Sequence, residues 1–322
     1  MSNRNSQSTL CAQLDELNGS WLAAMRAGRF SQAWRISDAA LRLRSGMECS
    51  HWPRHEQFIW RGAPLAGRRV LIRCYHGLGD TIQFVRFASR TSARHVTLWV
   101  QPQLLPLLRS MRGIDRLAPL DEGTPRISYD VDIELAELMH ALRVTPEVLA
   151  PELPYLHVRP AELEAAGDER LRVGIVWAAG QWNVRRSIPC EWLATLGDIP
   201  GIAWFVLQRG PSLSEWRHDF GTIPRIDDIV DEARALRALN LLITVDTCSA
   251  HLAGALAVPV WTLLPYDADW RWMRRRAETP WYPTMRLIRQ PRAGDWRQVL
   301  RIVERDLRAR VAQVGGASEA RS

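Results

Sequence analysis

The stretch LLITVDTCSAHLAGALAVPVWTLLP, residues 241–265, concentrates polar side chains within a few positions: Asp246, Thr247, Cys248, Ser249 and His251. They follow a short apolar run that is typical of a buried parallel strand, and they open a segment with helical character before a second apolar run. A strand, loop, helix and strand in this order direct free backbone N–H groups towards an anion such as phosphate. On the local pattern alone, Asp246 and Thr247 can equally serve only to cap the helix.

A second loop combines glycines with a carboxylate. Gly77 and Gly79 precede Asp80, and Gln83 follows one turn later. Glycines allow the backbone to approach a ligand closely, and a carboxylate beside them can accept a proton from a reacting hydroxyl. The alternative is that Asp80 only caps a helix that starts at Thr81.

Both loops require strands to position them. Residues 66–158 and 171–290 alternate apolar, strand-like runs with helical segments, which predicts two α/β halves with parallel sheets. Ligands of such folds bind beyond the carboxyl ends of the strands, so we expect two Rossmann-like domains that face each other across a cleft. The predicted strands are residues 69–74, 95–100, 115–120, 131–135, 171–177, 202–208, 241–245, 258–264 and 285–288.

The predicted boundaries complete this organisation. Residues 10–60 form a helical cap that is similar to one tetratricopeptide-like helix pair, since residues 10–46 carry apolar side chains at helical spacing. No second copy follows, so the cap either docks a partner or packs on the domain behind it. The two α/β domains cover residues 61–160 and 161–312, with a linker within 145–170. Residues 1–9 and 313–322 are predicted to be disordered tails.

Composition narrows the function classes. The net charge is +7, and all 42 basic residues are arginine, which points to a GC-rich genome as much as to an anionic partner. No nucleic-acid-binding signature accompanies the charge, so we expect no nucleic-acid partner. The five cysteines are scattered, and no apolar run is long enough to span a membrane or act as a secretory signal. We therefore expect a cytoplasmic protein, with the basic surface able to contact the inner face of the membrane.

Five segments together carry a resemblance to a known family: residues 77–87, 96–108, 171–180, 185–189 and 245–256. In this order they resemble glycosyltransferase family 9, the heptosyltransferase-like group with the GT-B fold. Residues 263–290 are similar to the branch in which the transferase follows tetratricopeptide repeats. The resemblance covers about residues 60–310. It implies an inverting, metal-independent enzyme that transfers a sugar, with heptose one candidate, from a nucleotide-diphosphate sugar to a hydroxyl.

The resemblance also implies roles for single residues. Asp80 is the catalytic base, and Gly77, Gly79 and Gln83 contact the acceptor or shape the loop. Arg186 stands where the heptosyltransferases have a lysine, and its neighbour Arg185 could substitute for it. The predicted donor-binding residues are Arg186, Gln208, Asp246, Thr247, Cys248, Ser249 and His251, with Gln208 placed to meet the nucleoside.

The remaining expectations concern partners and alternatives. We expect no cofactor apart from the nucleotide sugar as co-substrate, and no metal, because neither the Asp-x-Asp pairs at 130–132 and 267–269 nor the group Cys49, His51 and His55 forms a convincing ligand set. The acceptor is a glycan, a glycolipid, a protein or a small molecule. Two other functions stay open: a non-catalytic nucleotide-sugar-binding scaffold, and an epimerase or another enzyme of this fold acting on a nucleotide sugar.

Overall fold

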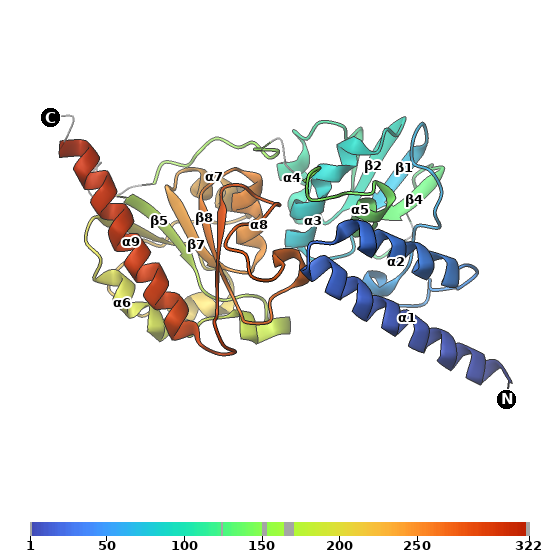
Figure 1. Cartoon of the computed structure of the whole chain (residues 1–322). Coiled ribbons are helices and arrows are strands. Elements are labelled where there is room, and N and C mark those ends of the chain that lie inside the picture. Colours follow the sequence, from blue (N-terminus) through green and yellow to red (C-terminus); the bar gives the residue numbers. More distant parts are fainter. Residues whose placement is uncertain (1, 124, 150–152, 164–170, 320–322) are drawn as a thin grey trace. The chain divides into compact units, whose positions relative to one another are not determined.

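The computed structural model describes residues 2–123, 125–149, 153–163 and 171–319. The chain forms two compact units, each considered separately below. The N-terminal unit comprises residues 1–151 together with 269–275, and the C-terminal unit comprises residues 152–268 and 276–322. The short segment 269–275 thus belongs to the first unit, although residues of the second unit precede and follow it in the chain (Figure 1).

In the N-terminal unit, two antiparallel helices, α1 (Ser2–Arg26) and α2 (Phe30–Leu43), precede a parallel sheet. The described strands of this sheet lie in the order β3-β2-β1-β4. They are β1 (Arg69–Arg73), β2 (His95–Val100), β3 (Arg116–Pro119) and β4 (Val131–Glu134). The helices between them are α3 (Leu78–Phe84), α4 (Leu105–Leu108) and α5 (Leu138–Ala141).

The C-terminal unit is a second doubly wound domain, and its described strands lie in the order β6-β5-β7-β8-β9, all parallel. The strands are β5 (Leu171–Val176), β6 (Ile202–Val206), β7 (Leu241–Val245), β8 (Val260–Leu264) and β9 (Met285–Arg289). The helices are α6 (Ala194–Gly197), α7 (Ile229–Arg237), α8 (Cys248–Ala255) and α9 (Trp296–Glu319).

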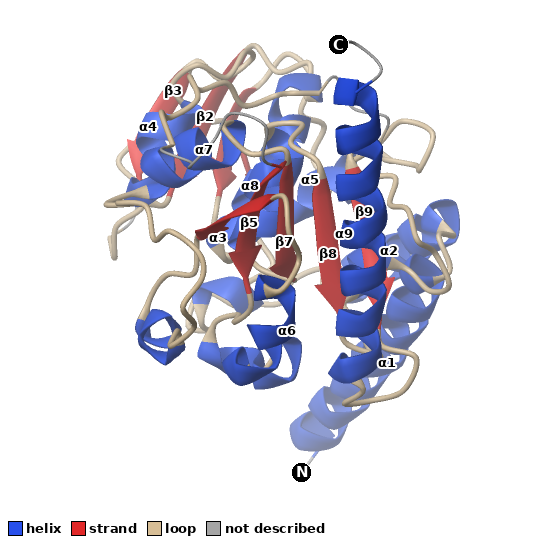
Figure 2. Ribbon diagram, turned by 90° about the vertical axis from the view of Figure 1, so that its left-hand side faces the viewer, coloured by secondary structure: helices blue, strands red, loops and turns tan. Residues whose placement is uncertain are grey.

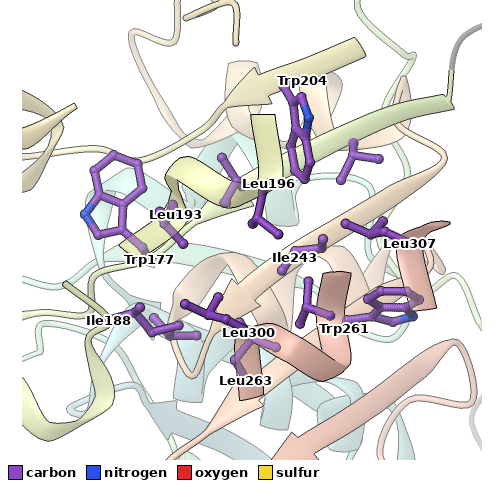
Figure 3. Packing of buried hydrophobic residues seen from close by; sticks show 14 of the residues in the cluster. Trp177, Ile188, Leu193, Leu196, Trp204, Ile243, Trp261, Leu263, Leu300 and Leu307 are labelled. Atoms are coloured by element: carbon purple, nitrogen blue, oxygen red, sulfur yellow. The ribbon is translucent and has the colours of Figure 1, made fainter. Parts of the chain in front are cut away.

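Apolar side chains cover both faces of this second sheet. On one face, residues of β5 to β8 pack against α6 and α9 in a large buried cluster that includes Trp204, Ile243 and Leu300 (Figure 3). Figure 2 shows α9 running along this face, while α8 lies on the other side of the strands. Burial on both faces explains why the strands read as continuous apolar runs in the sequence.

The predicted α/β class with two parallel sheets is confirmed, and every predicted strand is present with its ends shifted by one or two residues at most. The two ends of the chain differ from the prediction. The helix α1 begins at Ser2, so it covers most of the segment 1–9, and α9 extends through residue 319. Helix propagation is cooperative, and no proline or glycine stops α1 before residue 19. Only residues 320–322 of the second tail lie outside the described residues. The tetratricopeptide likeness of α1 and α2 and the cleft between the domains stay predictions.

Glycine at position 254 allows α8 to pack against the Tyr282 ring. A Cβ atom at this position would lie 2.5 Å from two atoms of that ring. We predict that Gly254→Ala destabilises the protein by about 1–3 kcal/mol in urea unfolding, because the rigid ring cannot yield. Gly19→Ala is the matched control in α1. Its Cβ would have no neighbour within 4 Å, so the variant should be stabilised by about 0.5–1 kcal/mol through helix propensity. Equal effects of the two changes would contradict the packing argument.

Candidate functional site

The two predicted loops lie at the positions where doubly wound sheets bind ligands. In the first sheet the strand order reverses between β1 and β4, and in the second it reverses between β5 and β7. At such a switch point, the connections leave in opposite directions and open a crevice beyond the carboxyl ends of the strands. The loop with Asp80 follows β1, and the loop with Asp246 follows β7.

Asp80 is held by its own loop. The helix α3 begins at Leu78 with Gly77 as its N-cap residue, so Asp80 lies inside the first turn and does not cap a helix starting at Thr81. The Gly77 backbone N–H donates to Asp80 Oδ2 at 3.1 Å. A side chain on Gly77 would place its Cβ only 3.3 Å from that oxygen, so glycine permits this close approach. Gly79 lies within the same first turn.

Arg271 holds the other oxygen of Asp80. Its Nη2 donates to Asp80 Oδ1 at 2.7 Å, and its own backbone N–H is bound by Asp269 Oδ1 at 3.0 Å. The preceding Trp270 stacks on Phe84 of α3, with ring centroids 6.3 Å apart, and meets the edge of Trp21 of α1 at 5.2 Å. The segment 269–275 is therefore fixed to α1 and α3, and its arginine orients the predicted base.

Gln83 is fully buried in α3, and among the described residues neither its side-chain oxygen nor its nitrogen has a hydrogen-bond partner. A buried amide without partners costs free energy, so such a residue calls for a reason other than stability. Its predicted contact with the acceptor or the loop stays a prediction.

Glu134 lies on the other side of the switch point of the first sheet, at the end of β4. Its Oε2 lies 3.6 Å from Nε2 of His76, in the loop after β1. Burial raises the pKa of Glu134 to about 8 and that of Glu137 to about 7, while hydrogen bonds from backbone N–H groups oppose the rise. Burial also lowers the pKa of His76. Both glutamates therefore hold protons well above the pH at which ordinary carboxyl groups lose them.

In the C-terminal unit, Arg186 and Asp246 form a buried ion pair. Arg186 Nη1 lies 3.0 Å from Asp246 Oδ2 and also 3.0 Å from the Asp246 backbone carbonyl. Arg186 is 8% exposed and Asp246 only 1%, so this is not a pair of solvated loop residues. Arg186 follows β5 and Asp246 follows β7, so the ion pair links the two sides of the switch point. Arg185, in contrast, is exposed.

Helix α8 begins directly behind this pair, with Thr247 as the N-cap and Cys248 as the first helical residue. Its first backbone N–H groups have no partners within the helix, which suits an anion. Ser249 is occupied elsewhere, because its hydroxyl donates to Glu232 Oε1 of α7 at 2.5 Å. Glu232 is completely buried, which raises its pKa, and it also receives Arg209 Nη1 at 3.3 Å.

Gln208 and His251 are likewise engaged within the unit. Gln208 Oε1 accepts from the backbone N–H groups of Trp177 and Ala178 at 3.1 and 2.9 Å, and its Nε2 donates to two carbonyls. The amide thus fixes the loop after β5. His251 is 2% exposed, and its Nδ1 lies 3.1 Å from the Tyr282 hydroxyl. The donor contacts predicted for both residues stay predictions.

Three residues that sequence reasoning overlooked help to hold the site: Arg271, Glu134 and Glu232. Arg271 lies within a segment rich in tryptophan and arginine, and nothing in the sequence distinguishes it from the neighbouring arginines as a partner of Asp80. The two glutamates could have been noticed from their place within or at the end of apolar segments, where a charge is unusual.

The described residues contain no group of three or more His, Cys, Asp or Glu side chains arranged to hold a metal. Asp130 and Asp132 form ion pairs with Arg69 and Arg73, respectively. Among the described helices, none is both long and apolar enough to cross a bilayer.

Comparison with known proteins supports the fold. No protein-family model matches the chain. Protein FlbA of Caulobacter vibrioides is 25% identical over 324 residues, which cover 87% of this chain and 53% of that protein, so the chain spans about half the length of this relative. The family 9 glycosyltransferase of Veillonella parvula aligns with a TM-score of 0.51 and 14% identity over 71% of this chain and 87% of its own. The ADP-heptose lipopolysaccharide heptosyltransferase II of Escherichia coli aligns with a TM-score of 0.50 and 14% identity, and the alignment covers 76% of this chain and 99% of that enzyme. The chain therefore has the GT-B fold of family 9 glycosyltransferases, as its motifs predicted.

Substitution of Arg271 tests whether its hydrogen bond to Asp80 matters for the predicted activity. We predict that Arg271→Gln lowers the kcat of the predicted sugar transfer about 10-fold, equivalent to about 1.4 kcal/mol, because the predicted base Asp80 loses the partner that orients it. The KM for the donor should change little. Arg274→Gln is the matched control, since that side chain is exposed in the same segment. Steady-state kinetics measure both variants. A kcat equal to or above that of the wild type would mean that the ion pair restrains the base.

The raised carboxyl pKa values predict an unusual pH dependence of stability. Between pH 4.5, the ordinary glutamate pKa, and about 8, the folded protein binds more protons at Glu134 than the unfolded chain. The free energy of unfolding must therefore fall as pH rises through this range, by about 2–4 kcal/mol. Urea unfolding at several pH values measures the slope. Glu134→Gln should flatten it, whereas the exposed Glu48→Gln should leave it unchanged; a slope that Glu134→Gln does not alter would contradict the assignment.

Proposed function

We propose that the chain is a glycosyltransferase that moves a sugar from a nucleotide-diphosphate sugar to a hydroxyl group, with inversion and without a metal. One observation carries the proposal: each of the two sheets has, at its switch point, a loop with the chemistry that one half of the reaction needs. The loop after β1 carries an oriented carboxylate. The loop after β7 carries a helix N-terminus beside a buried arginine.

In this reaction Asp80 accepts the proton of the acceptor hydroxyl while the hydroxyl oxygen attacks the anomeric carbon. The bond from that carbon to the diphosphate breaks on the opposite face, which inverts the configuration. The hydrogen bonds from Gly77 and Arg271 leave lone pairs on both Asp80 oxygens, because a carboxylate oxygen can accept two.

The leaving diphosphate gains negative charge, and it is stabilised by the backbone N–H groups that open α8 and by the positive charge of Arg186. Thr247 and Cys248 supply the first of these amides. A guanidinium offers several donors in a fixed plane, a geometry that suits the binding of phosphate oxygens. Gln208 then supports the donor by fixing the loop after β5.

The neighbours and the charge of the chain support a proposal for the donor and acceptor classes. An ADP-linked sugar is the first candidate, since one neighbour of the same fold is named for ADP-heptose. The acceptor is a glycan, glycolipid or protein hydroxyl. The protein works in the cytoplasm, where its arginine-rich surface can contact an anionic inner membrane face.

A second candidate is a non-catalytic nucleotide-sugar-binding scaffold. The observation that favours it is that both key charges already have protein partners: Asp80 with Arg271, and Arg186 with Asp246. A scaffold would bind a nucleotide without transferring a sugar, so turnover separates the two functions.

Calorimetric titration of ADP, UDP, GDP and CMP is the decisive experiment. We predict that one diphosphate binds, that Arg186→Gln weakens it about 10-fold or more, and that Asp80→Asn binds normally but loses turnover. Turnover should persist in a chelator. Binding without turnover in any donor and acceptor pair would favour the scaffold, and no nucleotide binding to folded protein would refute the proposal.

A further inference from the structure

Arg209 is a cation at the carboxyl edge of the second sheet. It lies three residues after β6, and β6 is the parallel neighbour of β5. The carboxyl ends of parallel strands meet at one edge of a sheet, so the loops after β5, β6 and β7 leave the C-terminal unit at the same edge. These loops carry Arg186, Arg209 and Asp246, respectively. Arg209 therefore shares this edge with the proposed diphosphate site.

A buried carboxyl group holds the side chain of Arg209. Its Nη1 lies 3.3 Å from Oε2 of Glu232, which belongs to α7 and is 4% exposed. The other oxygen of Glu232 accepts the Ser249 hydroxyl at 2.5 Å, and Ser249 is the second residue of α8. A single carboxyl group thus links the Arg209 guanidinium to the first turn of the helix at which we place the diphosphate.

The backbone of Arg209 is fixed as well. Gln208 is buried, and its Nε2 donates to the Arg209 carbonyl at 2.9 Å. The Oε1 of the same amide accepts the backbone N–H groups of Trp177 and Ala178, in the loop after β5. Because Arg209 is held at both its backbone and its guanidinium, it loses little conformational entropy when it binds a ligand.

The guanidinium nevertheless reaches solvent. The side chain of Arg209 is 43% exposed, whereas that of Arg186 is 10% exposed. Within the described part of the chain, Glu232 is the one acid that pairs with Arg209, and it is bound through Nη1. A guanidinium has five N–H donors, so Nε and Nη2 can bind a ligand from the solvent side. Phosphate oxygens suit this planar set of donors.

Arg186 and Arg209 are connected to opposite sides of the N-cap of α8. Arg186 binds Asp246, which immediately precedes the N-cap residue. Arg209 is connected through Glu232 to Ser249, which follows the N-cap residue by two positions. A monophosphate offers one anionic group to these two cations. A diphosphate offers two anionic groups joined by a bridging oxygen, so it can bind both.

A purely structural role would not require this arrangement. Burial raises the pKa of Glu232, while the hydrogen bonds from Ser249 and Arg209 oppose the rise. Such a buried acid is costly, and apolar side chains of similar size can join two helices without that cost. The acid in α7 instead provides a guanidinium of fixed direction at the edge of the sheet.

We propose that Arg209 is a second diphosphate-binding residue and that Glu232 is the positioning residue that holds its guanidinium beside α8. This inference rests on the proposed function and deepens it. Arg186 and Arg209 each bind one phosphate group of the nucleoside diphosphate, so the site selects diphosphates over monophosphates. Together the two arginines balance the charge of the leaving diphosphate.

The test compares each nucleoside diphosphate with its monophosphate by calorimetric titration of the full chain: ADP with AMP, UDP with UMP, and GDP with GMP. For the nucleoside that binds, we expect Arg209→Gln to lower the ratio of diphosphate to monophosphate affinity about 10-fold. Arg209→Lys, which keeps the charge without the planar fork, should lower the ratio less. Arg225→Gln is the matched control. Arg225 also pairs with an acid in the connection from β6 to α7, but its side chain is 87% exposed, so the ratio should not change.

Glu232→Gln tests the positioning role. The amide has nearly the same shape as the carboxyl group but no charge, so the guanidinium loses its ionic partner. We expect diphosphate affinity to fall about 3-fold in the wild-type background and not to fall further in Arg209→Gln. A purely structural role of Glu232 would weaken binding equally in both backgrounds and would overturn the positioning role.

The outcomes separate this inference from the proposed function. An unchanged ratio in Arg209→Gln would overturn the second phosphate contact, because a contact with the nucleoside weakens diphosphate and monophosphate equally. If Arg186→Gln still weakens the diphosphate in that case, the proposed function stands. Folded wild type that binds none of the nucleotides would refute the proposed function itself.

Discussion

Parallel strands place all their carboxyl ends at one edge of a sheet, and this constraint governs both halves of the protein. In each sheet the order of the strands reverses once, next to the strand that starts the domain. Neighbouring connections leave in opposite directions there, so the backbone cannot fill the space between them. Side chains from two separate loops must meet across that space. His76 and Glu134 do so in the first sheet, and Arg186 and Asp246 do so in the second.

The charges at these positions are held in pairs because unpaired buried charges are too costly. Asp246 is almost completely buried, and Arg186 Nη1 lies 3.0 Å from its Oδ2. The Glu232 carboxyl accepts a hydrogen bond from the Ser249 hydroxyl and forms an ion pair with Arg209. Glu134 has no cationic side chain of this kind at hydrogen-bond distance, and its carboxyl keeps its proton. The same physical rule therefore pairs Asp246 with Arg186 and Asp80 with Arg271, and it leaves a protonated carboxyl at Glu134.

The sequence predicted the strands well because both faces of each sheet are covered, which turns a strand into an uninterrupted apolar run between polar loops. The loops with Asp80 and Asp246 could be located for the same reason: each directly follows such a run. The side chains that bind these two aspartates could not be predicted. Arg271 is 191 residues from Asp80 in the chain, and no local pattern encodes a contact over that separation. Gln208 was predicted to end a strand, whereas β6 already ends at Val206. The hydrogen bonds from the backbone of residues 177 and 178 to the Gln208 amide depend on the neighbouring strand and could not be predicted. The ends of α1 and α9 were missed because polar composition indicates solvent exposure, and an exposed segment can still continue a helix that is packed elsewhere.

The helix pair at the N-terminus is integrated into its unit by specific polar contacts. Trp34 Nε1 donates to the Val144 carbonyl at 2.6 Å, and Asp38 binds both His140 and Arg143 at 2.7–2.8 Å. Apolar packing alone would tolerate several registers, whereas directional bonds to the segment after β4 fix one. A pair that served only to cover the domain would need no such precision, and it would leave no space beneath it, since interiors pack to high density. The polar contacts instead hold α2 against the segment after β4, and a pocket of about 330 Å³ remains between the helix pair and the ends of β1 and β4.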